Sequence, residues 1–224
     1  EICYPYRMTP LFKSDFSIGK SILTLNRPDE NNKGPSSVFD LALRARLQQV
    51  VLVEDCLTGF LKAKKIADDL GLQLIFGLRL SMCDEAQRPI PKGGDPTEHK
   101  IIVFATDKDG CKLLNQIYSW AFTTGTGRMD AKTLKTFWDN DHLHLCIPFY
   151  DSFIFKNLLN FKTSCVMDFS FCSPTFFLED NALPFDALVK EKVIKYTSQH
   201  EYATEETKTI YYEKSEDFAA YQTY

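Results

Sequence analysis

Three absences narrow what this chain of 224 residues can do. It has no run rich in lysine and arginine and a formal net charge of −4, whereas tight, phosphate-dominated binding of nucleic acid needs a concentrated basic footprint. It has no apolar run that approaches the ~20 residues of a membrane span, and no evident signal peptide. We therefore expect a cytoplasmic protein with no membrane partner, which touches DNA only through a larger protein if at all.

The cysteines also lack any recognisable pattern. Their number is odd, their spacing is irregular, and no C-x-x-C occurs. This usage predicts reduced thiols that act as small buried hydrophobic side chains in a cytosolic protein. The cysteines are Cys3, Cys56, Cys83, Cys111, Cys146, Cys165 and Cys172.

The most informative stretch predicts a β-α-β unit. Val50–Val53 is a short β-branched run typical of a buried strand, and Phe60–Leu70 repeats its apolar residues at helical spacing. Gly71 stands where a helix ends, and Leu72–Phe76 predicts a second buried strand. The two strands of such a unit are parallel, and ligands collect at the carboxyl ends of the strands. The residues at those ends are Glu54-Asp55-Cys56 and Gly77-Leu78-Arg79.

Strand and helix signals alternate along nearly the whole chain, without a break in composition or an internal repeat. This alternation predicts a single α/β domain over residues 1–224, with a mostly parallel sheet closed into a barrel. Further strands are expected at Leu11–Ser17, Ile101–Ala105, His142–Pro148, Val166–Phe171, Thr175–Leu178 and Lys208–Tyr212. Further helices are expected after a cap at Ser36 or Ser37, at Lys108–Phe122, Asp130–Phe137, Phe153–Phe161 and Asp186–Tyr196, and after a cap at Ser215.

Six short motifs follow one another from the first expected strand to the last. They are Phe12-Lys13-Ser14-Asp15-Phe16-Ser17, Val51-Leu52-Val53-Glu54-Asp55, Gly71 to Arg79, Lys100 to Asp107 with Gly110, Phe176-Phe177-Leu178-Glu179, and Ile210-Tyr211-Tyr212 with Ser215-Glu216-Asp217. This ordered set resembles the PHP (polymerase and histidinol phosphatase) domain that opens the alpha subunit of bacterial DNA polymerase III and of its phage relatives. The resemblance implies a distorted TIM-like (β/α) barrel of the PHP type.

Active members of that family are similar to one another in holding three metals at the strand ends through histidines and carboxylates. Such metals polarise phosphoesters and supply hydroxide at neutral pH. This sequence departs from the pattern at nearly every ligand position, and puts lysines and an arginine where imidazoles and carboxylates are needed. The corresponding positions are Leu11, Lys13, Lys20, Glu54, Asp55, Arg79, Lys100, Thr209 and Tyr211.

The resemblance and its departures lead to one hypothesis. The chain is a catalytically degenerate, metal-depleted PHP domain of a polymerase III alpha-like DNA polymerase encoded by a phage, and acts as a structural and docking module in DNA replication. Its partners would be the rest of the polymerase chain and a proofreading exonuclease or other replication proteins, in the cytoplasm of a bacterial host. The start at Glu1 without a methionine, and last residues that look like a helix cut short, lead us to expect the N-terminal fragment of a longer chain. No cofactor is expected, because basic side chains around Glu54 and Asp55 can replace metal charge with ion pairs.

Two other hypotheses stay open. A metal-dependent phosphoesterase or 3′–5′ exonuclease would use Mn²⁺, Zn²⁺ or Mg²⁺ at a rearranged site, with Glu54 and Asp55 as the catalytic pair. A free-standing interaction module would need no metal. The remaining residues that could serve the rearranged site are His99, Glu179, His142 and His144.

For several of these residues, a purely structural role competes with a functional one. In His142-Leu143-His144, alternate residues share a face and could chelate a metal, or the leucines could face the core while the histidines face polar surroundings. Basic neighbours are expected to lower the pKa values of both Glu54 and Asp55. Aromatic residues around Phe149 to Phe155 are mostly core candidates, with an exposed fraction that could form a docking patch.

Overall fold

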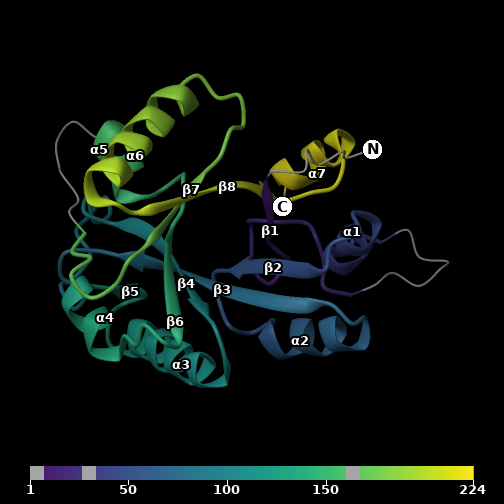
Figure 1. Ribbon diagram of the computed structural model, residues 1–224, viewed down its shortest axis with the longest axis horizontal. Helices are drawn as coiled ribbons and strands as arrows, with labels where there is room; N and C mark the ends of the chain where they lie inside the picture. Colours follow the sequence, from purple (N-terminus) through teal and green to yellow (C-terminus); the bar gives the residue numbers. More distant parts are fainter. Residues whose placement is uncertain (1–7, 27–33, 160–166, 224) are drawn as a thin grey trace. The chain divides into compact units, whose positions relative to one another are not determined.

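The chain folds as an α/β protein whose strands close into a ring. The computed structural model describes residues 8–26, 34–159 and 167–223 (Figure 1). The strands in these ranges are β1 (Thr9–Phe12), β2 (Gln49–Glu54), β3 (Gln73–Met82), β4 (His99–Ala105), β5 (Arg128–Met129), β6 (Leu143–Ile147), β7 (Thr175–Leu178) and β8 (Ala203–Ile210). Hydrogen bonds join these eight described strands in the order β2-β1-β8-β7-β6-β4-β3-β5, and β2 also pairs with β3, so seven of them close a mixed β-barrel. The predicted α/β class and closed barrel are confirmed.

The sheet is mostly parallel, as predicted. Among the described registers, β1–β2, β1–β8, β2–β3, β3–β5, β6–β7 and β7–β8 are parallel, and β4–β6 is antiparallel. The reversed β4 departs from the uniform strand-helix alternation of a TIM barrel, in which all strands are parallel.

The chain divides into two compact units. Unit 1 comprises Glu1–Leu78 and Thr207–Tyr224, and unit 2 comprises Arg79–Glu206. The helices are α1 (Val38–Arg44), α2 (Phe60–Asp69), α3 (Lys108–Thr123), α4 (Ala131–Phe137), α5 (Phe153–Leu159), α6 (Asp186–His200) and α7 (Phe218–Thr223). In the described ranges, no helix combines the length and the apolar character that crossing a membrane requires.

Unit 1 is built on the predicted β-α-β unit. β2 is buried from Val50 to Glu54 and pairs in parallel with β3, in the register Val50↔Leu74 to Glu54↔Leu78. The helix α2 buries Ala63 and Ala67, and Gly71 follows it with a φ of +68°, a left-handed conformation that favours glycine. The predicted strand-helix-strand order and parallel pairing are therefore confirmed. The predicted end of the second strand is wrong, because β3 continues to Met82 and Gly77-Leu78-Arg79 lie within it, with Leu78 opposite Glu54.

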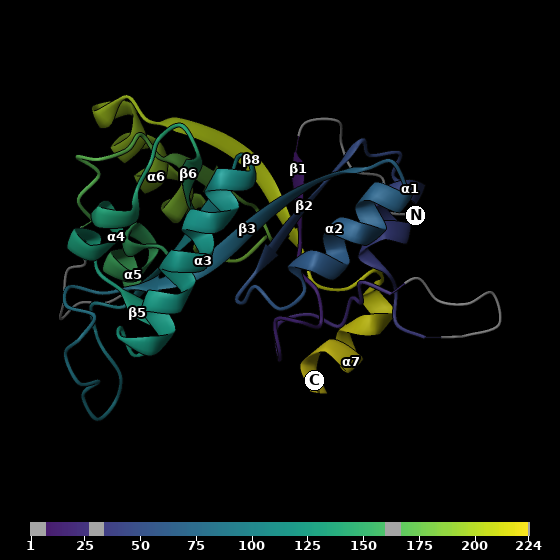
Figure 2. The ribbon, with the colours of Figure 1, turned by 90° about the horizontal axis from the view of Figure 1, so that it is seen from below.

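Unit 2 packs helices against β4, β6 and β7. The N-terminus of α3 approaches β6 so closely that a Cβ on Gly110 would lie 2.1 Å from the backbone oxygen of His142, so this position requires glycine. Asp107 caps α3 by accepting a hydrogen bond from the Gly110 N–H. Figure 2 shows α3 beside α4 and α5 beside α6, in agreement with their contacts.

Some element predictions are wrong. The strand predicted over Val166–Phe171 is absent from its described part, residues 167–171, because the side chain of Asp168 accepts hydrogen bonds from the N–H and hydroxyl of Ser170 and forms a local turn instead. Ser215 does not cap the last helix. A 3₁₀ turn, Ser215–Asp217, precedes α7, and its cap is Lys214, whose N–H donates to Asp217. The short strand β5 was not predicted, and the end of the helix predicted to Phe161 lies outside the described residues.

Candidate functional site

The carboxyl ends of β1 and β2 bring Lys13 and Asp55 together in unit 1. The two strands are parallel, with Phe12 opposite Leu52, so the residues that follow them emerge side by side. Lys13 Nζ lies 3.1 Å from Asp55 Oδ1, and the Lys13 side chain is 4% exposed whereas that of Asp55 is 32% exposed. An ammonium group therefore occupies the strand end beside this carboxylate, as the sequence predicted.

Glu54 is fully buried in the same cluster and is held by two serines. Its Oε1 accepts hydrogen bonds from the Ser14 N–H at 3.0 Å and from the Ser14 hydroxyl at 2.5 Å, and its Oε2 accepts one from the Ser17 hydroxyl. Burial raises the pKa of Glu54 above its usual range, against the hydrogen bonds from both serines and the charge of Lys13, which lower it. The predicted net lowering of the Glu54 pKa is therefore wrong, because desolvation outweighs the lowering by Lys13.

The loop after β1 is fixed to β2 by the same serines. The Ser17 hydroxyl also accepts a hydrogen bond from the Asp55 N–H at 2.9 Å, and the Cys56 thiol donates to the Phe16 carbonyl at 3.4 Å. A Cβ on Gly59 would meet the Phe16 ring at 3.0 Å, so glycine leaves room for this ring. The acidic pair thus belongs to a buried scaffold rather than to an open cleft.

The other predicted positions of unit 1 are placed around this scaffold. Leu11 is buried in β1, opposite Val51 and Thr209 in the register of the sheet, and Thr209 and Tyr211 are partly exposed. Lys20 is exposed in the loop after β1. Among the described residues of unit 1, Lys13 is therefore the predicted cation that forms an ion pair with Asp55.

Arg79 is paired in unit 2. Its Nη2 donates to Asp151 Oδ2 at 2.7 Å, and Lys156 Nζ lies 3.9 Å from the other carboxylate oxygen. Asp151 has a φ of +61°, and its carbonyl accepts a hydrogen bond from the Lys100 N–H at 2.8 Å. Sequence reasoning did not single out Asp151, since nothing in its local pattern shows that the end of β6 turns toward Arg79.

Lys100 belongs to a second polar cluster of unit 2. Its ammonium donates to the Ser81 hydroxyl and lies 3.5 Å from Glu98 Oε1, and the same hydroxyl donates to Glu98 at 2.7 Å. These side chains are about one-third exposed or less, and Ser81 is buried. The basic residues predicted around Glu54 and Asp55 are therefore distributed over separate carboxylates.

The four candidate metal ligands of unit 2 have different partners. His99 is 3% exposed, its Nδ1 lies 3.1 Å from the Thr97 carbonyl, and its Nε2 has no hydrogen-bond partner among the described residues. Burial lowers the pKa of His99, so the imidazole is neutral at pH 7. Glu179 is buried just after β7.

His142 and His144 also diverge. His142 Nδ1 lies 2.7 Å from Asp107 Oδ2, and the resulting hydrogen bond raises the pKa of His142. His144 Nε2 lies 3.0 Å from the Thr175 hydroxyl, and burial lowers its pKa. Leu143 is buried beside them. The structural interpretation of this motif, with leucines inward and histidines in polar surroundings, therefore agrees with the structure.

The residues present do not fit the multi-metal centre of the PHP family. Within residues 8–26, 34–159 and 167–223, no three His, Cys, Asp or Glu side chains form a group that could hold a metal ion. At the strand ends of unit 1, Glu54 is engaged by two serines and Asp55 by the ammonium of Lys13, and an ammonium cannot ligate a metal.

The aromatic segment from Phe149 to Phe155 is less exposed than a docking patch requires. Phe149 and Phe153 are buried, and Tyr150 and Phe155 pack edge-to-face with each other at 5.7 Å. The Tyr150 hydroxyl donates to Asp186 at 2.9 Å. This segment therefore belongs mainly to the core of unit 2.

The chain matches no protein-family model, and no curated protein aligns with it.

Proposed function

We propose that this chain is a metal-free barrel domain of the PHP type, which serves as a structural and docking module of a polymerase III alpha-like DNA polymerase in DNA replication. The proposal includes the TIM-like, distorted form of the barrel and the phage origin. It assigns no hydrolytic role to the chain itself.

The Lys13–Asp55 pair is the observation that carries the proposal. It lies at the carboxyl ends of adjacent parallel strands, where barrel enzymes of this kind hold their catalytic groups. A buried ammonium supplies there the positive charge that a metal would supply, but cannot generate a hydroxide or accept a phosphoester oxygen as a ligand. The order of the six motifs and the closed, mostly parallel barrel add support.

Two assays test the proposal. The chain, incubated with Mn²⁺, Zn²⁺ or Fe²⁺, is expected to hydrolyse neither 3′-end-labelled single-stranded DNA nor p-nitrophenyl phosphate above the level of an Asp55→Asn variant. The protein that the native gene encodes is expected to extend a DNA primer, and Asp55→Asn in that protein is expected to lower the temperature at which primer extension is lost.

Asp69→Asn is the matched control, because Asp69 is an exposed carboxylate at the end of α2. It should leave the inactivation temperature unchanged. Hydrolysis that Asp55→Asn abolishes would contradict the proposal in favour of the phosphoesterase, and a native gene product without primer extension would contradict the link to a polymerase.

A further inference from the structure

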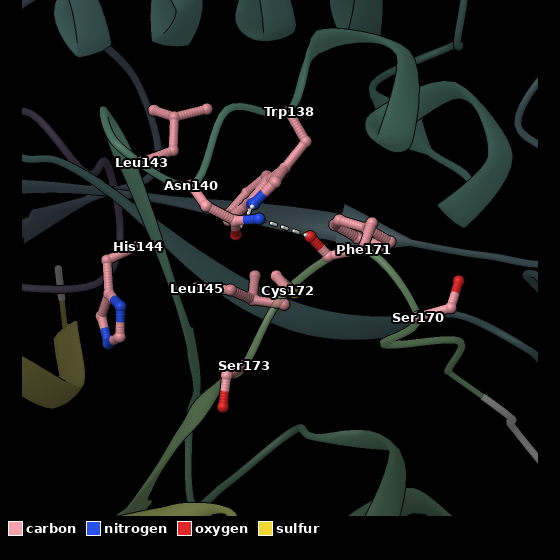
Figure 3. A pocket seen from close by; sticks show the side chains of 9 residues that line it. All are labelled: Trp138, Asn140, Leu143, His144, Leu145, Ser170, Phe171, Cys172 and Ser173. Atoms are coloured by element: carbon pink, nitrogen blue, oxygen red, sulfur yellow. Dashed lines mark hydrogen bonds between the residues drawn. The ribbon is translucent and has the colours of Figure 1, made fainter.

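A pocket of unit 2 opens where β7 separates from β6. Its volume is about 500 Å³, within the range of binding pockets for small ligands or single side chains. Trp138 and Phe171 form walls, Leu145 and Cys172 lie deep in it, and His144 and Ser173 stand at its edge (Figure 3). The described residues that line the pocket all belong to unit 2, and none of them belongs to the polar clusters described above.

One edge of β6 is uncovered at this pocket. β4 pairs with β6 along Leu143 to Cys146, whereas the register with β7 covers only Cys146 and Ile147. β7 starts at Thr175, and the residues before it, 170–174, are not in a strand. The pocket therefore takes the place of the next residues of β7.

The backbone of β6 presents hydrogen-bonding groups to this edge. The carbonyl of His142 accepts from the Thr106 N–H on the β4 side, and backbone groups of successive residues alternate between the two sides of a strand. The backbone N–H and C=O groups of Leu143 and Leu145 must therefore point toward the pocket. Asp139 accepts the Leu143 N–H at 2.8 Å, which leaves the Leu143 carbonyl and the Leu145 N–H on the pocket side.

The walls of the pocket are held in place. Trp138 and Phe171 pack edge-to-face at 5.4 Å. Asn140 connects them, since it accepts from the Trp138 indole N–H at 2.8 Å and donates to the Phe171 carbonyl at 3.0 Å. Figure 3 shows these two hydrogen bonds crossing the upper part of the pocket. Binding would consequently meet a preformed aromatic wall rather than order one.

The lining is uncharged. Among the described residues that line the pocket there is no Asp, Glu, Lys or Arg. Burial lowers the pKa of His144 and raises the pKa of Cys172 to about 12, so an imidazole and a thiol, both neutral, face the space at pH 7. The described lining matches an apolar or aromatic side chain.

We propose that the pocket is a docking site for an extended peptide of a partner protein, which pairs with the open edge of β6 and packs an uncharged aromatic side chain against the wall formed by Trp138 and Phe171. The uncovered strand edge supplies main-chain hydrogen bonds and the aromatic walls supply specificity, as in other cases of strand addition. The inference specifies the docking part of the proposed function, but it concerns unit 2 alone and makes no use of the strand-end cluster of unit 1.

The test is a titration of the ¹⁵N-labelled chain with a capped peptide, acetyl-Ser-Thr-Val-Phe-Val-Thr-Ser-amide, followed by NMR. Saturable shifts are expected at the Leu145 amide and the Trp138 indole N–H. Methylation of the peptide nitrogen after the phenylalanine should weaken binding about tenfold or more, since it removes a main-chain donor. Replacing the phenylalanine by alanine should weaken it by a similar factor, as for an anchor residue.

Ser173→Trp should fill the pocket and abolish binding, whereas Ser119→Trp, on an equally exposed serine of α3, should preserve it. Absence of saturable shifts in the unaltered chain would overturn the inference. Equal binding of the methylated peptide would also overturn it, because main-chain pairing with β6 would then not contribute. Equal binding of free indole would overturn it as well, because the pocket would then be a small-molecule site. Metal binding and primer extension do not enter this test, so its failure is distinguishable from failure of the proposed function.

Discussion

The polar cluster at the strand ends of unit 1 and that of unit 2 contain the same kinds of residue in different surroundings. In unit 1, Lys13 and Glu54 are almost or fully buried. The hydrogen-bond donors to Glu54 lie in the loop after β1, and Lys13 pairs with Asp55 just after β2. In unit 2, Arg79 pairs with an Asp151 side chain that is 44% exposed. Water can replace a lost partner in unit 2 but not around Glu54, so the same substitution has different consequences in the two clusters.

The two clusters therefore differ in how much they are expected to contribute to stability. The buried carboxylate of Glu54 accepts hydrogen bonds from three donors and so fixes the loop after β1 in one arrangement. Replacing this residue would leave those donors buried without an acceptor. Pairs in which the carboxylate is exposed, such as Arg79–Asp151, are expected to contribute less to stability, because water can hydrate the carboxylate. The unit 1 cluster is therefore expected to contribute more to the stability of the fold than the Arg79–Asp151 pair of unit 2.

Glu54→Ala should have the largest effect. It leaves the N–H and hydroxyl of Ser14 and the hydroxyl of Ser17 buried without their acceptor, and should lower the free energy of unfolding by about 3 kcal/mol or more. Urea denaturation measures it. Glu191→Ala, on the exposed face of α6, is the control and should change stability by less than about 0.5 kcal/mol. Equal losses in the two variants would contradict the structural role of Glu54.

The two partners of the Lys13–Asp55 pair should respond unequally. Asp55→Asn removes the carboxylate beside a buried ammonium and should cost about 3 kcal/mol, as for other broken buried pairs. Lys13→Met leaves a carboxylate that is 32% exposed and can be hydrated, and should cost about 1 kcal/mol. The double variant should be more stable than Asp55→Asn alone in the same denaturation experiment. A larger loss for Lys13→Met than for Asp55→Asn would refute the assignment of the buried partner.

Arg79→Met in unit 2 should cost less than about 1 kcal/mol, because the carboxylate that it leaves behind is hydrated. Repeating the denaturation at about 1 M NaCl, where the screening length is near 3 Å, should abolish most of this difference. A loss as large as that of Asp55→Asn, insensitive to salt, would show that the two clusters are not distinct in the way described.

The smallest effect is expected from pH at the exposed His142. The hydrogen bond to Asp107 raises the pKa of His142 above its usual 6.5, so the folded state prefers the protonated imidazole. This stabilisation is complete below about pH 6.5 and is lost as the pH rises through the raised pKa. His142→Gln should therefore lower the melting temperature at pH 5.5 and have less effect at pH 8.5. The reverse trend would contradict the direction of the shift.

Periodicity and turn residues were enough to predict most of the fold. The β-branched run before Glu54, the helical spacing of α2 and the glycine that ends it are local signals, and the structure bears them out. The strand predicted over Val166–Phe171 is wrong in its described part because a side-chain hydrogen bond from Ser170 to Asp168 competes with the sheet. Such competition depends on a single side chain and leaves no trace in an apolar pattern.

The candidate site was less predictable, because its properties arise from contacts between distant segments. The resemblance to the PHP family implied that basic residues surround Glu54 and Asp55, and Lys13 is paired with Asp55. The raised pKa of Glu54, however, depends on how completely the loop after β1 covers it. A buried ion pair of unit 2, Arg128 with Asp95, was not predicted for the same reason. The pocket beside Trp138 requires knowledge of where β7 leaves β6, which register alone decides.

Metal content shows whether the ammonium of Lys13 has taken the place of a metal centre at the strand ends of unit 1. The chain is dialysed against Mn²⁺, Zn²⁺ and Fe²⁺, then against metal-free buffer, and its metal content is measured by elemental analysis. We expect well below one equivalent of any metal per chain. One or more tightly held equivalents, reduced by Asp55→Asn, would contradict it and would favour a metal-dependent phosphoesterase.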